Sequence, residues 1–141
     1  MVNTAIAKQR IIKTSVEEEN CKKMVGELNI KVGEPFNAVS SLSGGNQQKV
    51  LLSKWIFAKP DVLILDEPTR GIDVGAKYEI YCLINKLVAQ GKGVLIISSE
   101  LPEILGMCDR IYVMNEGRIV AEMPREKASQ ESIMNAILSS H

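Results

Sequence analysis

The chain has 141 residues, enough for one domain with a buried core, and its 45% hydrophobic and 24% charged residues are ordinary for a soluble globular protein. Seventeen basic and seventeen acidic residues leave a formal net charge of zero, so no overall field favours nucleic acid or an anionic membrane. No apolar run approaches the roughly 18 residues of a membrane span, and three widely spaced cysteines with a single histidine favour free thiols in a reducing, cytoplasmic setting over disulfides or a zinc site.

The first predicted element is a helix over about residues 15–29. Ser15 followed by Glu18 is a capping-box pattern at its start. The apolar residues of its inner face are Val16, Met24, Val25 and Leu28.

A glycine-containing loop then leads into a second predicted helix. Residues 42–49 read LSGGNQQK and continue into an apolar helix through Ala58. A serine and two glycines at a helix start leave backbone N–H groups unpaired at the positive end of the dipole, which suits a phosphate. For Ser-Gly-Gly alone, a serine cap after a flexible loop is the simpler interpretation. Leu51, Trp55 and Ala58 share a helical spacing that predicts core positions.

A short apolar strand ending in two acids is the next element. Val62–Leu65 is followed by Asp66 and Glu67, with Pro60 and Pro68 on either side. Apolar residues at every position predict a central parallel strand that is covered on both faces. The acids would then lie at the carboxyl edge, where open α/β sheets place their ligands. Taken alone, this stretch is more simply interpreted as a buried strand before an ordinary acidic turn.

The remaining elements alternate as in an α/β protein. Asp73 is placed to cap a helix over about 74–90 whose apolar stripe packs on the sheet, and Ser99 follows the next strand at the ligand edge. The other predicted elements are a strand at 94–98, a short helix at 101–107, a hairpin of strands 111–114 and 119–123, and a last helix from Ser129.

Three of these segments together resemble the ABC (ATP-binding cassette) ATPases. Residues 42–49 resemble the signature motif, 62–67 the Walker B strand with its adjoining glutamate, and 71–73 (GID) the D-loop. The resemblance covers residues about 40–125. The strings NQQK, PTRGIDVGAK and SSELPE look like the second cassette of the tandem ATPases that energise bacterial importers of ribose, galactose or xylose.

This resemblance implies a fold and a domain organisation. The expected fold class is α/β, a partial P-loop NTPase fold with a parallel sheet flanked by helices. The chain would be the C-terminal part of the second cassette, a single partial nucleotide-binding domain over 1–141. Residues about 15–58 would form its helical, signature-bearing part and 59–141 the C-terminal part of the ATPase core.

The resemblance also assigns roles at the cassette's own ATP site. Asp66 would hold Mg²⁺ through water, a suitable role for a hard carboxylate ligand. Glu67 would polarise the water that attacks the γ-phosphate. Ser99 stands where the family usually has a histidine, and it supplies a hydroxyl but no imidazole. A serine there implies a site that hydrolyses slowly or serves mainly in binding.

Other residues would serve the ATP site of the opposite cassette. Ser43, Gly44, Gly45 and Asn46 of the signature motif would bind the γ-phosphate of a nucleotide held there, and Asp73 would reach across the same interface. The expected partners are the first cassette of the same polypeptide, transmembrane permease subunits and, indirectly, a sugar-binding protein, with no nucleic acid. The intact complex would hold this chain at the inner face of the cell membrane.

One element of the family pattern is missing from the 141 residues. No Gly-x-x-x-x-Gly-Lys-Ser/Thr phosphate loop occurs in the sequence. Without its backbone cradle and lysine, we expect the chain to bind ATP weakly and not to turn it over. In the family's fold the strand that precedes this loop would lie between the strands at 94–98 and 111–114. Its absence would leave unpaired sheet edges, which predicts self-association.

Two other classes of function compete with a sugar-importer ATPase. One is a freestanding interaction or dimerisation module that uses the signature helix without catalysis. The other is an ABC-type ATPase of DNA repair or chromosome organisation, which should show a long coiled coil or basic patches; neither is visible in the sequence.

Overall fold

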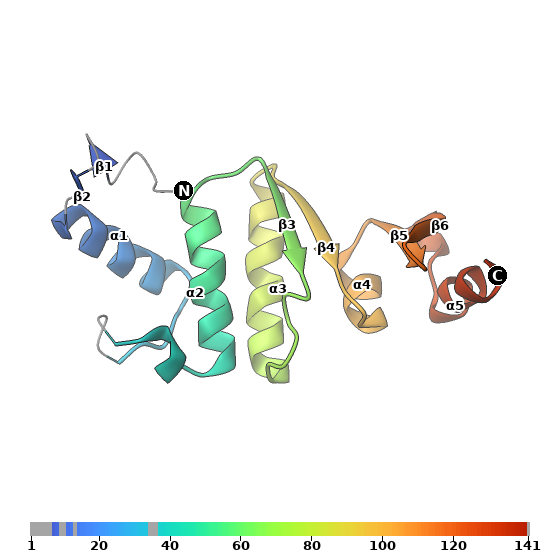
Figure 1. Cartoon of the computed structure of the whole chain (residues 1–141), viewed down its shortest axis with the longest axis horizontal. Helices are drawn as coiled ribbons and strands as arrows, with labels where there is room; N and C mark the ends of the chain where they lie inside the picture. Colours follow the sequence, from blue (N-terminus) through green and yellow to red (C-terminus); the bar gives the residue numbers. More distant parts are fainter. Residues whose placement is uncertain (1–6, 9–10, 13, 34–36, 141) are drawn as a thin grey trace. The chain divides into compact units, whose positions relative to one another are not determined.

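The computed structural model describes residues 7–8, 11–12, 14–33 and 37–140. The elements, in chain order, are β1 (Ala7–Lys8), β2 (Ile11–Ile12), α1 (Thr14–Glu27), a 3₁₀ turn (Val39–Ser41), α2 (Gly44–Phe57), β3 (Val62–Asp66), α3 (Val74–Ala89), β4 (Gly93–Ile97), α4 (Leu101–Met107), β5 (Arg110–Asn115), β6 (Arg118–Pro124), a second 3₁₀ turn (Arg125–Lys127) and α5 (Gln130–Leu138) (Figure 1). None of the helices in these residues is long and apolar enough to cross a membrane.

The predicted elements from residue 15 onward are confirmed in type and order. One boundary detail is wrong. Helix α1 begins at Thr14, so Ser15 lies inside its first turn and is not the cap that the Ser15–Glu18 pattern predicted. The chain divides into two compact units, a first unit of residues 1–63 with 68–95 and a second unit of residues 64–67 with 96–141.

Strands β3 and β4 pair side by side, and helix α3 connects them in the sequence. At one end the amide of Gly93 donates to the carbonyl of Asp61 (2.9 Å), and at the other the amide of Glu67 donates to the carbonyl of Ile97 (2.8 Å). Both strands advance in the same direction between these bonds, so the pair is parallel (Figure 1). The expected β–α–β arrangement is therefore present, with a parallel sheet of two strands in the part of the chain that is described.

The two faces of β3 differ in burial. Leu63 and Leu65 are buried, whereas Val62 is 66% exposed and Ile64 63% exposed. The prediction that helices cover both faces of this strand is wrong. The strand's apolar run is continuous, but within the described residues only one of its two alternating faces is covered.

Helices α2 and α3 pack against each other in the first unit and run parallel, with their N-terminal ends together (Figure 1). The buried residues of α2 are Gly45, Lys49 and Leu52. The predicted core positions Leu51, Trp55 and Ala58 are exposed, Trp55 by 55%. That prediction is wrong because Gly45 admits α3 closely and thereby turns a neighbouring face of the helix inward.

The second unit contains the antiparallel hairpin of β5 and β6 and the helix α5. Glu116 and Gly117 both have positive φ (48° and 76°), as a tight two-residue hairpin turn requires. The core of this unit is formed by Ile111, Val113 and Ile133. The last helix begins next to Ser129 as predicted, and Ser129 caps it, since its hydroxyl accepts a hydrogen bond from the amide of Ser132 (3.1 Å).

Candidate functional site

Glu67 stands at the carboxyl end of β3 in the second unit. Its backbone is left-handed (φ 47°), a conformation that costs a non-glycine residue about 1 kcal/mol and needs support from its surroundings. The hydrogen bond that its backbone amide donates to the carbonyl of Ile97 supplies part of that support. The side chain is held as well, because Oε1 accepts a 3.1 Å hydrogen bond from the backbone amide of Ser99. The structure thus brings two of the predicted catalytic residues together.

Asp66 is the last residue of β3, and its side chain is exposed. It shares the open face of the strand with Val62 and Ile64, because side chains alternate along a strand. No cluster of three or more His, Cys, Asp or Glu side chains occurs among the described residues. A single carboxylate fits Mg²⁺ nevertheless, since this ion usually keeps several waters and takes other ligands from substrate phosphates.

The predicted phosphate-binding residues lie at the start of α2 in the first unit. Ser43 occupies the N-cap position without a side-chain cap bond. Its hydroxyl oxygen instead accepts a 2.8 Å hydrogen bond from Nδ2 of Asn46, whose Oδ1 accepts from the amide of Lys31 (2.9 Å). Both polar atoms of the Asn46 side chain are therefore used within the chain, while the hydroxyl proton of Ser43 stays available to another acceptor.

The two glycines of the motif pack against the start of α3. A Cβ on Gly44 would lie 3.5 Å from the side chain of Ile72, an ordinary contact. A Cβ on Gly45 would lie 2.5 Å from the Cβ of Ala76, closer than side chains pack. Asp73 caps α3 by accepting a 2.9 Å hydrogen bond from the amide of Ala76. The start of α2 is thus in direct contact with the loop and first turn of α3.

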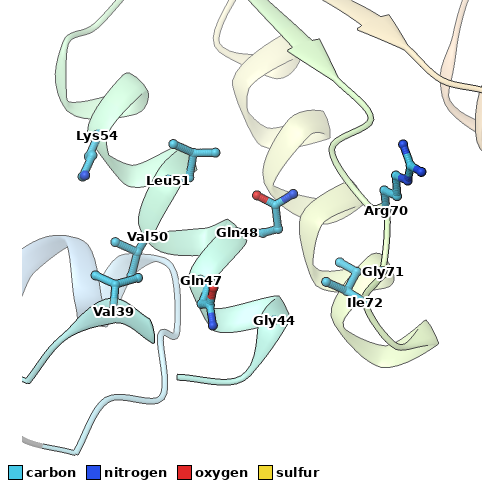
Figure 2. Close-up of a pocket in the computed structure, with 10 residues that line it drawn as sticks. All are labelled: Val39, Gly44, Gln47, Gln48, Val50, Leu51, Lys54, Arg70, Gly71 and Ile72. Carbon is cyan, nitrogen blue, oxygen red and sulfur yellow. The ribbon is translucent and has the colours of Figure 1, made fainter. Parts of the chain in front are cut away.

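An open cleft of about 420 Å³ lies beside this contact. Figure 2 shows its lining, which comes from α2, the first 3₁₀ turn and the loop before α3. Lys54 and Arg70 are the cationic side chains of the lining, and Gln47 and Gln48 supply amides. Together with the unpaired N–H groups at the start of α2, these cations make the cleft attractive to an anion.

The structure also shows residues that the sequence analysis missed. Lys49 is buried and contacts Asn29 and Glu79, and it connects α2 to two other segments of the first unit. A signal existed in the sequence, because Gly45, Lys49 and Leu52 follow the i, i+4, i+7 spacing of one helix face. A lysine is ordinarily expected on a solvated face, so this pattern alone does not predict its burial.

The sequence of this chain is similar to those of known ATP-binding proteins. A family model described as ABC transporter matches residues 3–70. The L-arabinose transport ATP-binding protein AraG of Geobacillus stearothermophilus is 60% identical over 129 residues, which is 92% of this chain and 25% of the relative. The chain is part of an ABC transporter ATP-binding domain.

Other relatives of this ATP-binding domain carry similar names. The xylose import ATP-binding protein XylG of Thermoanaerobacter pseudethanolicus is 57% identical over 92% of this chain and 26% of the relative. The ribose import ATP-binding protein RbsA of Clostridium perfringens is 56% identical over 84% of this chain and 24% of the relative. The chain thus spans about a quarter of the length of these relatives.

Solved structures support the same family. A nucleotide-free ATP-binding cassette from an ABC transporter has a TM-score of 0.69 and 30% identity, over 86% of this chain and 46% of that one. Another ATP-binding cassette of an ABC transporter has a TM-score of 0.70 and 28% identity, over 95% of this chain and 51% of that one. The expected partial ABC-ATPase fold is therefore confirmed, with a short parallel sheet and helices.

Proposed function

We propose that this chain belongs to the ATP-binding subunit of a bacterial monosaccharide importer and contributes residues to two different ATP sites. Its relatives are named for arabinose, xylose and ribose, which makes a pentose or a similar monosaccharide the favoured class of substrate. The structural observation that carries the proposal is the carboxylate of Glu67, held at the carboxyl end of a parallel strand by the amide of Ser99.

At the cassette's own site, Glu67 orients the attacking water. The amide of Ser99 engages Oε1, so Oε2 is left to accept a hydrogen bond from that water. Asp66 would hold Mg²⁺ through water, and the bound ion would neutralise charge on the phosphate oxygens. Ser99 presents a neutral hydroxyl where the family usually has an imidazole, which favours slow hydrolysis or a mainly binding role.

At the opposite cassette's site, the start of α2 binds phosphate. The hydroxyl of Ser43 and the amides of Gly44 and Gly45 donate hydrogen bonds to the γ-phosphate oxygens. Asn46 contributes indirectly, because it fixes the hydroxyl oxygen of Ser43. Asp73, at the adjacent start of α3, belongs to the same interface. The partners are the first cassette of the polypeptide and transmembrane permease subunits, with a sugar-binding protein acting indirectly, at the cytoplasmic face of the membrane.

The test of this function is complementation. A segment that carries a phosphate loop, taken from the part of the similar protein AraG of Geobacillus stearothermophilus outside the 129 matched residues, is mixed with the tagged chain with and without Mg-ATP. We expect capture that is stronger with ATP, and a slow ATPase rate in the mixture that Glu67→Gln abolishes. Glu116→Gln, in the β5–β6 turn, is the control that keeps the rate. Absence of both responses would refute the proposed function.

The pure chain should show no turnover, because it has no phosphate loop to hold the β- and γ-phosphates. A steady ATPase rate of the pure chain that depends on Glu67 would overturn this part of the proposal.

A non-catalytic interaction module is the second candidate. The exposed Val62 and Ile64 favour it, since an open apolar strand face is suited to binding another chain. Capture that is equally strong with and without ATP, and unaffected by Glu67→Gln, would select this function over the first.

A further inference from the structure

A buried lysine joins the helices α2 and α3. Lys49 is 2% exposed, and its ammonium group donates a 2.9 Å hydrogen bond to the carbonyl of Asn29 and forms an ion pair with Glu79. A buried cation is costly unless such partners replace the water it loses. The side chain of Glu79 is 43% exposed, so its carboxylate remains hydrated while the ammonium group depends on its protein partners.

The ion pair lies one helical turn beyond the closest approach of the two helices. Gly45 and Ala76 make that approach, and Lys49 and Glu79 follow them by four and three residues on the same faces. The glycine contact sets the spacing of α2 and α3, and the ion pair adds a directional bond farther along. Two contacts separated by a turn resist both sliding and rotation of one helix against the other.

A third segment is bonded to the same helix. The carbonyl of Asn29 accepts from Lys49, and two residues later the amide of Lys31 donates to Oδ1 of Asn46. Asn46 in turn bonds to the hydroxyl of Ser43. The segment 29–31 thus connects the buried ammonium group to the serine at the helix start through hydrogen bonds that the structure shows individually.

We propose that Lys49 and Glu79 are positioning residues that hold the Ser43 start of α2 and the Asp73 start of α3 in one fixed relation. The proposal rests on the proposed function for its consequence, because these helix starts carry the groups that would meet the opposite cassette's nucleotide. Lys49 does not touch that nucleotide; it acts through Asn29, whose segment orients Asn46 and Ser43, and Glu79 acts through Lys49.

The variant Lys49→Met separates positioning from stability. Methionine fills a similar volume without a charge, and the carboxylate of Glu79 that remains is partly hydrated. Removing one partner of a buried ion pair is strongly destabilising when the charge that remains is buried, but here the remaining charge is the partly hydrated carboxylate of Glu79. We therefore expect the urea midpoint of Lys49→Met to stay close to that of the parent chain, whereas Glu79→Leu lowers it because an uncompensated ammonium group is left buried.

Amide hydrogen exchange tests the positioning directly and requires no nucleotide. The reporters are the amides of Lys31 and Ala76, which bond to the side chains of Asn46 and Asp73. In Lys49→Met we expect both to exchange about tenfold faster through local opening, while the amide of Glu67 in the second unit is unchanged. Lys49→Arg should restore protection. Unchanged exchange of Lys31 and Ala76 in Lys49→Met would overturn the proposal.

The control for a merely structural effect is Leu52→Ala on the same buried face of α2. It should lower the urea midpoint, because it leaves a cavity. The exchange rate of the Lys31 amide relative to the other amides of the first unit should stay unchanged. If Leu52→Ala gave the same selective pattern as Lys49→Met, the positioning role would be refuted.

The complementation assay supplies the functional arm. We expect ATP-dependent capture to weaken about tenfold in Lys49→Met and to recover in Lys49→Arg, with Leu52→Ala weakened little at temperatures where it is folded. Failure of the parent chain itself to respond to ATP would refute the proposed function, and the exchange experiment would still decide the positioning of the two helix starts.

Discussion

The backbone amide of Ser99 donates a 3.1 Å hydrogen bond to Oε1 of Glu67. The donor is main chain, so the side chain at position 99 can change without releasing the carboxylate. This separates two properties of residue 99, its support of Glu67 and the chemistry of its hydroxyl.

Substitutions at Glu67 should therefore be visible at the amide of Ser99. Glu67→Ala removes the acceptor, and we expect an upfield shift of the Ser99 amide proton and faster exchange. Glu67→Gln keeps an oxygen acceptor and should largely preserve both. Backbone ¹H–¹⁵N spectra measure these effects, with Glu116→Ala as the control. An amide of Ser99 that is identical in Glu67→Ala and the parent chain would contradict the contact.

The close approach of Gly45 to Ala76 predicts a steric cost. In Gly45→Ala the new methyl group would lie 2.5 Å from the Cβ of Ala76, so the helices must shift apart. We expect a loss of about 1–3 kcal/mol in the free energy of unfolding, measured by urea titration. Gly44→Ala, with its nearest contact at 3.5 Å, should cost clearly less.

Two further variants make this prediction specific. Gly26→Ala lies in α1, where the new Cβ would meet no other described part of the chain within 4 Å, and it should be neutral or stabilising by about 0.4–1 kcal/mol. Ala76→Gly introduced into Gly45→Ala removes the opposing methyl group and should recover part of the loss. A Gly45→Ala chain as stable as the parent would show that the helices do not approach so closely.

The local sequence pattern predicted the helices and strands in type and order. The errors concern which side chains are buried, because contacts between elements decide burial. The apolar spacing from Ile80 to Val88 predicted the inner face of α3, and Ile80 and Ile84 are buried there, whereas Val88 is 45% exposed. The same reasoning failed for Trp55 on α2, since an apolar spacing does not show which face meets a partner. Gly45 decided that face through its missing Cβ.

At the candidate site, too, the sequence predicts residue positions but not the contacts between residues far apart in the chain. Glu67 could be identified from its place after an apolar strand, a local property. Its bond to Ser99 joins residues 32 positions apart and exists only because β3 and β4 pair in parallel. The buried role of Lys49 likewise depends on Asn29 and Glu79, which no local periodicity connects to it.

The ion pair of Asp61 and Lys92 predicts a contribution to acid unfolding. The hydrogen bond and charge of Lys92 hold the pKa of Asp61 below its ordinary value. A depressed pKa means stability that is present above the ordinary Asp value and is lost as pH falls through the depressed one. Asp61→Asn should therefore lower the urea midpoint slightly at neutral pH and not at about pH 2.

Salt provides the check on this mechanism. Asp61 is fully exposed, so the difference between the parent chain and Asp61→Asn should shrink in about 1 M NaCl. A difference that is independent of both pH and salt would point to the loss of another contact instead.

The cysteines should differ in reactivity. Burial raises the pKa of Cys108, and the nearby charges of Glu103 and Asp109 raise it further, whereas Cys21 and Cys82 are exposed. Because the thiolate is the nucleophile, iodoacetamide at about pH 8 should label Cys21 and Cys82 first. Peptide mass spectrometry against time measures this order. Unfolding in urea should equalise the three rates, and equal rates in the folded chain would contradict the burial of Cys108.

The exposed face of β3 predicts self-association of the chain. Ile64 is 63% exposed on a strand that carries no charge before Asp66, a pattern that favours pairing with another chain. Ile64→Thr keeps the β-branched shape but removes apolar surface, so it should lower the apparent mass at high concentration in light scattering. Val74→Thr, an equally mild change at the exposed start of α3, is the matched control and should leave the mass unchanged. A parent chain that stays monomeric at the highest concentration reached would show that this face does not drive association.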